Sequence, residues 1–118
     1  MPDRAAIQSA DPNERILAIR AAGKAKDKQA VPLLVDRLED EDEAVRFFAI
    51  LALDRITGRH ERFGYDYAKP ARERAKAVEQ WRRYVRDGED SMLHDGSSHA
   101  REGQAVEARA SGTQESQP

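Results

Sequence analysis

The sequence predicts an all-α fold in which two antiparallel helical hairpins stack into a short α-solenoid with a disordered C-terminal tail. Apolar residues recur at helical spacing in Val31, Leu34, Val35 and Leu38, which is the pattern of one buried helical stripe. No segment shows the apolar and polar alternation of a half-buried strand. The chain also resembles itself when it is shifted by 31 residues, which indicates a repeated hairpin.

The first hairpin is expected to begin at Asp11. Asp11 can accept a hydrogen bond from a free backbone N–H, Pro12 suits the first helical position, and Glu14 completes a capping box. Asp27 is expected to cap the second helix. The acidic run 39–43 then ends that helix and begins the next, where the helix dipole favours carboxylates. This run lacks the glycine and the alternating ligands of a calcium loop, so no divalent-cation site is expected there.

The third helix carries apolar residues on most of its sides, which predicts that it packs between other helices. Gly58 is expected to end it as a left-handed C-cap. An aromatic loop follows, and Pro70 begins a fourth helix that is expected to end near residue 86. Five residues of this helix are expected to face the core: Ala71, Ala75, Val78, Trp81 and Val85.

The internal repeat relates the start of the first helix to the start of the third. The shift of 31 residues places Asp11 on Asp42, Arg15 on Arg46, Ala18 on Ala49 and Ile19 on Ile50. Each copy continues into a second helix, which is the pattern of a solenoid whose units bury their apolar faces on one another.

With these residues, and with Ala30-Val31-Pro32-Leu33-Leu34 in the second helix, segment 11–86 resembles HEAT repeats of the short, phycobilisome-lyase-like kind found in bacterial proteins. The resemblance implies a structural polar ladder along the solenoid. That ladder would consist of Asp11, Arg15, Asp42 and Arg46. The same residues are also i, i+4 pairs within single helices, and both accounts can hold together. The sequence departs from the family pattern at Asp54, which replaces the usual glycine of the second copy.

Three regions are expected along the chain. Residues 1–10 are an N-terminal extension, 11–86 form the repeat domain (repeat one 11–40, repeat two 42–86), and 87–118 are a disordered acidic tail. The chain up to residue 86 carries 18 Lys and Arg against 15 Asp and Glu, whereas the tail carries 2 against 7. The tail also holds few large apolar residues, so burial cannot offset its loss of chain entropy.

The composition suggests a cytoplasmic protein. The 118 residues include no cysteine, which excludes disulfides and thiolate metal sites and suits a reducing compartment. The first residues lack the pattern of a signal peptide. The longest apolar run, 47–53, is too short to span a membrane.

An enzyme is not expected, and no catalytic residue, metal site or cofactor is assigned. The sequence contains no phosphate-cradling glycine loop and no metal-ligand cluster. His60 lies in a polar loop and is interpreted as a solvated residue, while His94 and His99 lie in the predicted tail. Relatives of this repeat type include bilin lyases, but a shared fold does not carry their activity.

The predicted function is that of a protein-interaction module or scaffold that docks another protein on the face of its second helices. Arginine suits carboxylate and phosphate partners, although a solvated helix face explains the same residues. Tyr65 and Tyr67 are anchors if they are exposed; otherwise Tyr65 covers the end of the core with Phe63. The candidate partner-binding residues are Arg37, Arg72, Lys76, Arg83, Tyr65 and Tyr67. Self-association is a further possibility, and the alternative function is nucleic-acid binding by the basic last helix.

Overall fold

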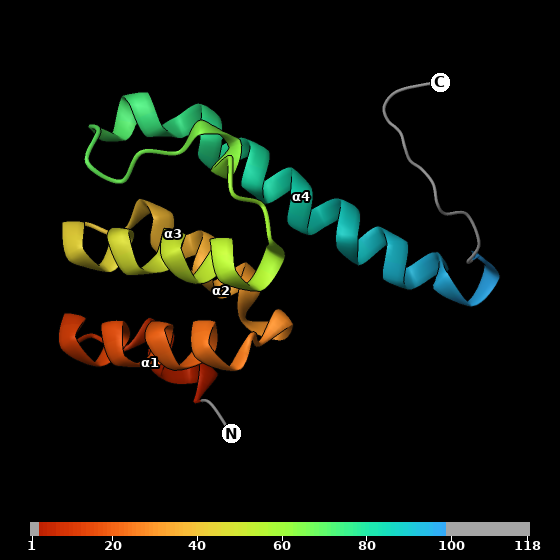
Figure 1. Ribbon diagram of the computed structural model, residues 1–118, viewed down its shortest axis with the longest axis horizontal. Coiled ribbons are helices and arrows are strands. Elements are labelled where there is room, and N and C mark those ends of the chain that lie inside the picture. Colours follow the sequence, from red (N-terminus) through yellow and green to blue (C-terminus); the bar gives the residue numbers. More distant parts are fainter. Residues whose placement is uncertain (1–2, 99–118) are drawn as a thin grey trace. The chain divides into compact units, whose positions relative to one another are not determined.

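The computed structural model describes residues 3–98, with side chains up to residue 88, and these residues are all-α with no strand among them. The predicted fold class, a short all-α solenoid, is confirmed (Figure 1). The chain divides into two units, residues 1–85 and 86–118, and the fold described below is that of the first. The α-helices of the described residues are α1 (Pro12–Ala25), α2 (Val31–Asp36), α3 (Glu43–Thr57) and α4 (Ala71–Ser98), of which α4 begins in the first unit and continues past it. The 3-10 helices are η1 (Arg4–Gln8), η2 (Lys28–Ala30), η3 (Arg37–Glu39) and η4 (Arg62–Gly64).

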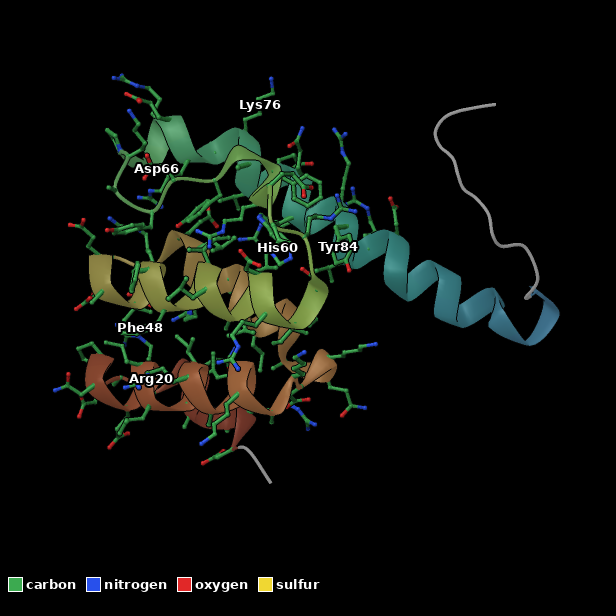
Figure 2. All side chains as sticks on the ribbon, viewed as in Figure 1. Arg20, Phe48, His60, Asp66, Lys76 and Tyr84 are labelled. Carbon is green, nitrogen blue, oxygen red and sulfur yellow. The ribbon has the colours of Figure 1, made fainter. Side chains whose placement is uncertain are left out.

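Helices α1 and α3 stack side by side and run in the same direction (Figure 1). Near their C-terminal ends the approach is so close that a Cβ built on Gly23 would lie 3.1 Å from the Cβ of Ala52. Nearer the middle, the Arg20 guanidinium lies 5.5 Å from the centre of the Phe48 ring (Figure 2). The two helices are therefore parallel and in register, as the repeat predicts.

Asp11 caps α1 and Gly58 caps α3 as predicted, but the predicted capping box is wrong, because Glu14 accepts from the Ser9 hydroxyl and not from the N–H of Asp11. Asp11 accepts a hydrogen bond from the backbone N–H of Asn13, and Asp42 accepts from those of Ala44 and Val45. Helix α3 ends at Gly58, whose φ of 72° is left-handed and therefore favours glycine. Repeat-equivalent aspartates thus satisfy free N–H groups at the start of each first helix.

The second helix of the first repeat is not continuous. It is expected as one helix capped by Asp27, but η2, α2 and η3 follow one another from residue 28 to residue 39. Asp27 does act as the cap, because it accepts from the N–H of Gln29. The predicted apolar stripe is confirmed, since Val31, Leu34, Val35 and Leu38 are all buried.

The N-terminal residues belong to the fold, which the interpretation of 1–10 as an extension did not foresee. Ile7 of η1 has no exposed surface and joins the core cluster. Arg4 is held to Asp27 by an ion pair of 2.8 Å. One buried isoleucine in a short polar segment gives no periodic signal, so the sequence alone did not assign it to the core.

Helix α4 differs from its prediction in length and in its buried face. It continues to Ser98, past the end expected near residue 86, because an isolated Gly88 weakens a helix without ending it. Residues 99–118 of the predicted tail lie outside the described residues. The predicted core positions Ala71 and Ala75 are wrong, since both are exposed. Val78 and Trp81 are buried as predicted, Val85 is half-buried against the core, and Arg74 and Ala77 are buried as well.

Candidate interaction surfaces

Asp40, not the capping aspartates, holds the polar ladder between the repeats. Its carboxylate accepts hydrogen bonds from Arg15 Nη2 and Arg37 Nη1, both at 3.1 Å, and from the backbone N–H of Asp42 at 2.9 Å. Arg15 Nε also lies 3.0 Å from Asp40 Oδ2, although its N–H is not aligned for a hydrogen bond. The predicted i, i+4 pairs are wrong: among the described residues, Asp11 and Asp42 form no ion pair with the arginines of their own helices.

The two ladder arginines occupy equivalent places in the two repeats. Arg15 Nη1 donates to the carbonyl of Ser9 at 2.8 Å, and Arg46 Nη1 donates to the carbonyl of Asp40 at 2.8 Å, in each case six residues back along the chain. Arg46 Nε then donates to the carbonyl of Tyr67. Both guanidinium groups are almost fully buried, and these acceptors offset the loss of their hydration. The sequence identified the arginines but not Asp40, whose match by the repeat shift is Ser9.

Tyr65 is part of the core, which confirms the alternative that it covers the end of the core and excludes it as an exposed anchor. Only 6% of its surface is exposed, and its hydroxyl donates to the carbonyl of Leu38 at 2.7 Å. Burial raises the pKa of Tyr65 to about 12, although the charges of Arg74 and Arg46 oppose that shift. Tyr67 is half-buried, with its ring 5.0 Å from that of Phe47 in an edge-on arrangement. The loop thus covers one end of the core formed by the described residues.

A left-handed turn at residues 62–64 sets the shape of this loop. Arg62 and Phe63 have φ values of 57° and 53°, which cost energy for residues that carry a Cβ. The indole N–H of Trp81 donates to the carbonyl of Arg62 at 3.1 Å, and the Phe63 ring lies edge-on at 5.0 Å from the indole. These two contacts hold the strained turn against α4. They also confirm the prediction that Trp81 is a core residue.

Asp54 explains the departure from glycine in the second copy. Its match in the first copy is Gly23, where a close approach of α3 leaves no room for a side chain. At Asp54 the space is filled by the loop instead: Arg62 Nε donates to its carboxylate at 2.8 Å, and His60 Nδ1 contacts the other oxygen. Burial raises the pKa of Asp54, but the hydrogen bonds from Arg62 and His60 outweigh it and leave the pKa below 3.8. The His60 side chain is otherwise 82% exposed, in line with its interpretation as a loop residue.

The predicted cations of the second-helix face do not lie together. Arg37 is half-buried and paired with Asp40, so it is not free to bind a partner. Arg72, Lys76 and Arg83 are exposed on the face of α4 opposite its buried residues, and Lys76 points away from α3 (Figure 2). We call these three residues the α4 stripe. Arg72 and Lys76 form no ion pair among the described residues, and Arg83 lies 3.8 Å from the exposed Glu79.

Two further arginines of α4 tie it to the first repeat. Arg82 donates to Asp36 at 2.8 Å and also binds Glu39, and these contacts raise its pKa even though partial burial opposes them. Arg74 is buried and donates to the carbonyls of Leu38 and Lys69. The sequence predicted a basic last helix but singled out neither of these arginines. No local signal separates them from their exposed neighbours, because the packing of α4 decides which arginines turn inwards.

Within residues 3–88, no group of three or more His, Cys, Asp or Glu could hold a metal ion. None of the helices in the described part of the chain is both long enough and apolar enough to cross a membrane. The polar clusters around Asp40 and Asp54 consist of ion pairs that link segments of the fold.

The family model for HEAT repeats matches residues 4–87. The chain therefore belongs to the HEAT-repeat family, whose members are commonly protein-interaction scaffolds and generally not enzymes. The match begins at Arg4 and so includes η1, in agreement with the burial of Ile7. No curated protein and no solved structure matches the chain.

Proposed function

We propose that this protein is a non-catalytic protein-interaction module, and that it docks an acidic surface of another protein on the α4 stripe. One observation carries the proposal. Arg72, Lys76 and Arg83 project from the same face of a helix whose other side is packed on the core, so the three cations are exposed on a rigid support. Arginine adds bidentate hydrogen bonding to carboxylates.

Burial and ion pairing reduce the set of candidate partner-binding residues. Tyr65 and Arg37 are removed from it by burial and by the ion pair to Asp40, and Tyr67 is half-buried against Phe47. The polar residues of the stripe do not need a partner for stability, because exposed cations remain hydrated. The proposal includes a cytoplasmic location, which the absence of cysteine suits.

Nucleic-acid binding by α4 is the alternative. Glu73 and Glu79 are exposed on the same helix, and negative charges beside the cations oppose the binding of a polyanion. The resemblance to the short, lyase-associated bacterial repeats adds no substrate to either function, because a shared fold does not carry an activity.

Affinity capture with matched variants tests the proposal. The full chain is immobilised in nuclease-treated extract of its host and compared with the variant Arg72→Glu, Lys76→Glu, Arg83→Glu. The control variant Arg20→Glu, Lys69→Glu reverses two exposed cations elsewhere. We expect the stripe variant to lose captured proteins that the control retains. Equal capture by both variants would contradict the proposal. Proteins that the wild-type chain captures from untreated extract but not from nuclease-treated extract would favour the nucleic-acid alternative.

A further inference from the structure

Apart from Arg20, whose guanidinium lies over the Phe48 ring, the unpaired charges at the ends of the first helices are sorted by sign onto opposite edges of the solenoid. Because α1 and α3 are parallel and in register, their N-terminal ends lie at one edge and their C-terminal ends at the other (Figure 1). Each helix is about 20 Å long. The two edges are thus separated by more than the screening length of roughly 8 Å at physiological ionic strength, so they do not neutralise each other within one molecule.

The basic edge consists of Lys24, Lys26, Lys28 and Arg55. All four residues are exposed, and none forms an ion pair with a described residue. Lys24 and Arg55 are equivalent by the repeat shift, so the edge has one row of charge from each repeat. The neighbouring Arg59 and Arg62 are already paired with Glu61 and Asp54 and are left out of it.

The acidic edge consists of Asp11, Glu14, Glu41 and Glu43. These four residues are exposed and likewise have no ion pair in the part of the chain that the structure describes. Asp11 accepts from the N–H of Asn13, and Glu14 accepts from the Ser9 hydroxyl, but neither contact neutralises the charge. The acids again form two rows, at the start of α1 and at the start of α3.

Helix dipoles account for part of this sorting, since acids stabilise N-terminal ends and bases stabilise C-terminal ends. A second consequence follows from the stacking. The charges of both edges lie at or next to the ends of the same two parallel helices, so the separation between the two repeats is the same on both edges. The two edges are therefore opposite in sign and equal in number of unpaired charges, which divide three to one between the repeats on the basic edge and two to two on the acidic edge.

We infer that the partner of the basic edge is the acidic edge of a second copy of this chain. In this contact the C-terminal ends of α1 and α3 face the N-terminal ends of the same helices in the neighbour, so the helix dipoles are also aligned favourably. The contact is heterologous, because different surfaces meet and each added copy leaves one edge of either sign free. It uses neither Arg72, Lys76 nor Arg83, and so does not depend on the function proposed for the α4 stripe.

Exposed ion pairs are individually weak and are screened by salt. We therefore expect concentration-dependent association at low ionic strength that reverses at high ionic strength. The test is analytical ultracentrifugation of the full chain at about 1 mM. The weight-average mass should rise above the monomer mass of 13.3 kDa in roughly 0.01 M salt and return to it in roughly 1 M salt.

Two charge-reversed variants make the test specific. The first, Lys24→Glu, Lys28→Glu, Arg55→Glu, has two acidic edges; the second, Glu14→Lys, Glu41→Lys, Glu43→Lys, has two basic edges. The capping residues Asp11 and Asp42 are left unchanged. Each variant alone should remain monomeric at low salt, and an equimolar mixture should associate. The variant Arg72→Glu, Lys76→Glu is the control and should associate like the wild type.

Several results would overturn the inference. If the wild-type chain stays at its monomer mass of 13.3 kDa in low salt, the contact between edges is excluded. Binding of an added nucleic-acid oligonucleotide would not change that conclusion. Association that persists in both reversed variants assigns it to another surface. A monomeric mixture of two folded variants, with circular dichroism like the wild type, shows that the edges do not pair. Loss of association in the α4 control would instead assign it to the α4 stripe.

Discussion

Gly23 of α1 lies so close to Ala52 of α3 that a Cβ on Gly23 would be 3.1 Å from the Cβ and 3.2 Å from the Cα of Ala52. Real Cβ atoms rarely approach so closely, and one of the atoms is backbone, so the two helices would have to separate slightly. The glycine therefore permits the tight stacking of the first helices, and its match Asp54 is free to carry a side chain because only the loop lies above it.

The substitution Gly23→Ala should destabilise the fold. Alanine gains about 1 kcal/mol of helix propensity over glycine, but overpacking typically costs about 1–3 kcal/mol. We expect a net loss of about 1 kcal/mol in the free energy of unfolding, measured by urea denaturation. Gly88→Ala is the control, since a Cβ there meets no atom within 4 Å. Equal effects of the two substitutions would mean that α1 and α3 are not so closely packed.

Asp40→Asn should cost more than any other exchange of aspartate for asparagine in the ladder. The substitution keeps the size of the side chain but leaves the buried Arg15 without its counter-charge. Breaking a buried ion pair typically costs about 3–5 kcal/mol, and we expect about 3 kcal/mol because Arg37 is partly solvated. The measurement is the free energy of unfolding at neutral pH.

Asp42→Asn is the matched control for Asp40→Asn. Asparagine caps helices about as well as aspartate, and Asp42 contacts only backbone N–H groups, so its loss should stay below about 1 kcal/mol. A larger effect at Asp42 than at Asp40 would show that the capping aspartates, as first predicted, are the ladder residues.

Acid should remove the stabilisation that Asp54 provides. The pKa of Asp54 in the folded protein is below its unfolded value of 3.8, so its contribution is complete above about pH 4 and is lost as the pH falls through the lower, folded pKa. Asp54→Asn should therefore flatten the fall in unfolding free energy between pH 5 and pH 2, measured by urea denaturation at each pH.

The neighbouring Glu61 also has a lowered pKa in the folded protein, so its contribution to stability is lost in acid as well and adds to the fall that is measured. Burial raises the pKa of Glu61, but the hydrogen bond from Arg59 outweighs it and leaves the pKa below 4.5. Glu61→Gln should flatten a separate part of the curve that begins at a higher pH. If the unfolding free energy of Asp54→Asn falls with pH as steeply as that of the wild type, Asp54 does not contribute to the loss of stability in acid.

A comparison of Tyr65→Phe with the wild type should show that Tyr65 ionises near pH 12. Burial raises the pKa of Tyr65 to about 12, so the stability from its protonated hydroxyl is present below pH 10 and is lost as the pH rises through about 12. In an absorbance titration, the tyrosinate signal that appears last should be missing from the variant. The variant should lose only about 1 kcal/mol, because Arg74 still donates to the Leu38 carbonyl.

The sequence by itself determined the repeat, the helix caps and the apolar stripe of the second helix. These features depend on residues that act locally: an aspartate satisfies the N–H groups two and three residues ahead, Gly58 adopts a left-handed φ, and helical spacing marks a buried face. Each of them acts within one turn or one helix, so a linear pattern suffices to predict it.

Only the tertiary structure decided which polar residues turn inwards. Asp40, Arg74 and Arg82 do not differ locally from solvated neighbours, and Tyr65 and Ile7 lie in segments too short to be periodic. Their roles depend on partners between 25 and 46 residues away, such as Arg15 for Asp40 and Asp36 for Arg82. A buried charge or hydroxyl is stable only where the fold supplies such a partner, and that pairing follows from the stacking of helices rather than from any local pattern.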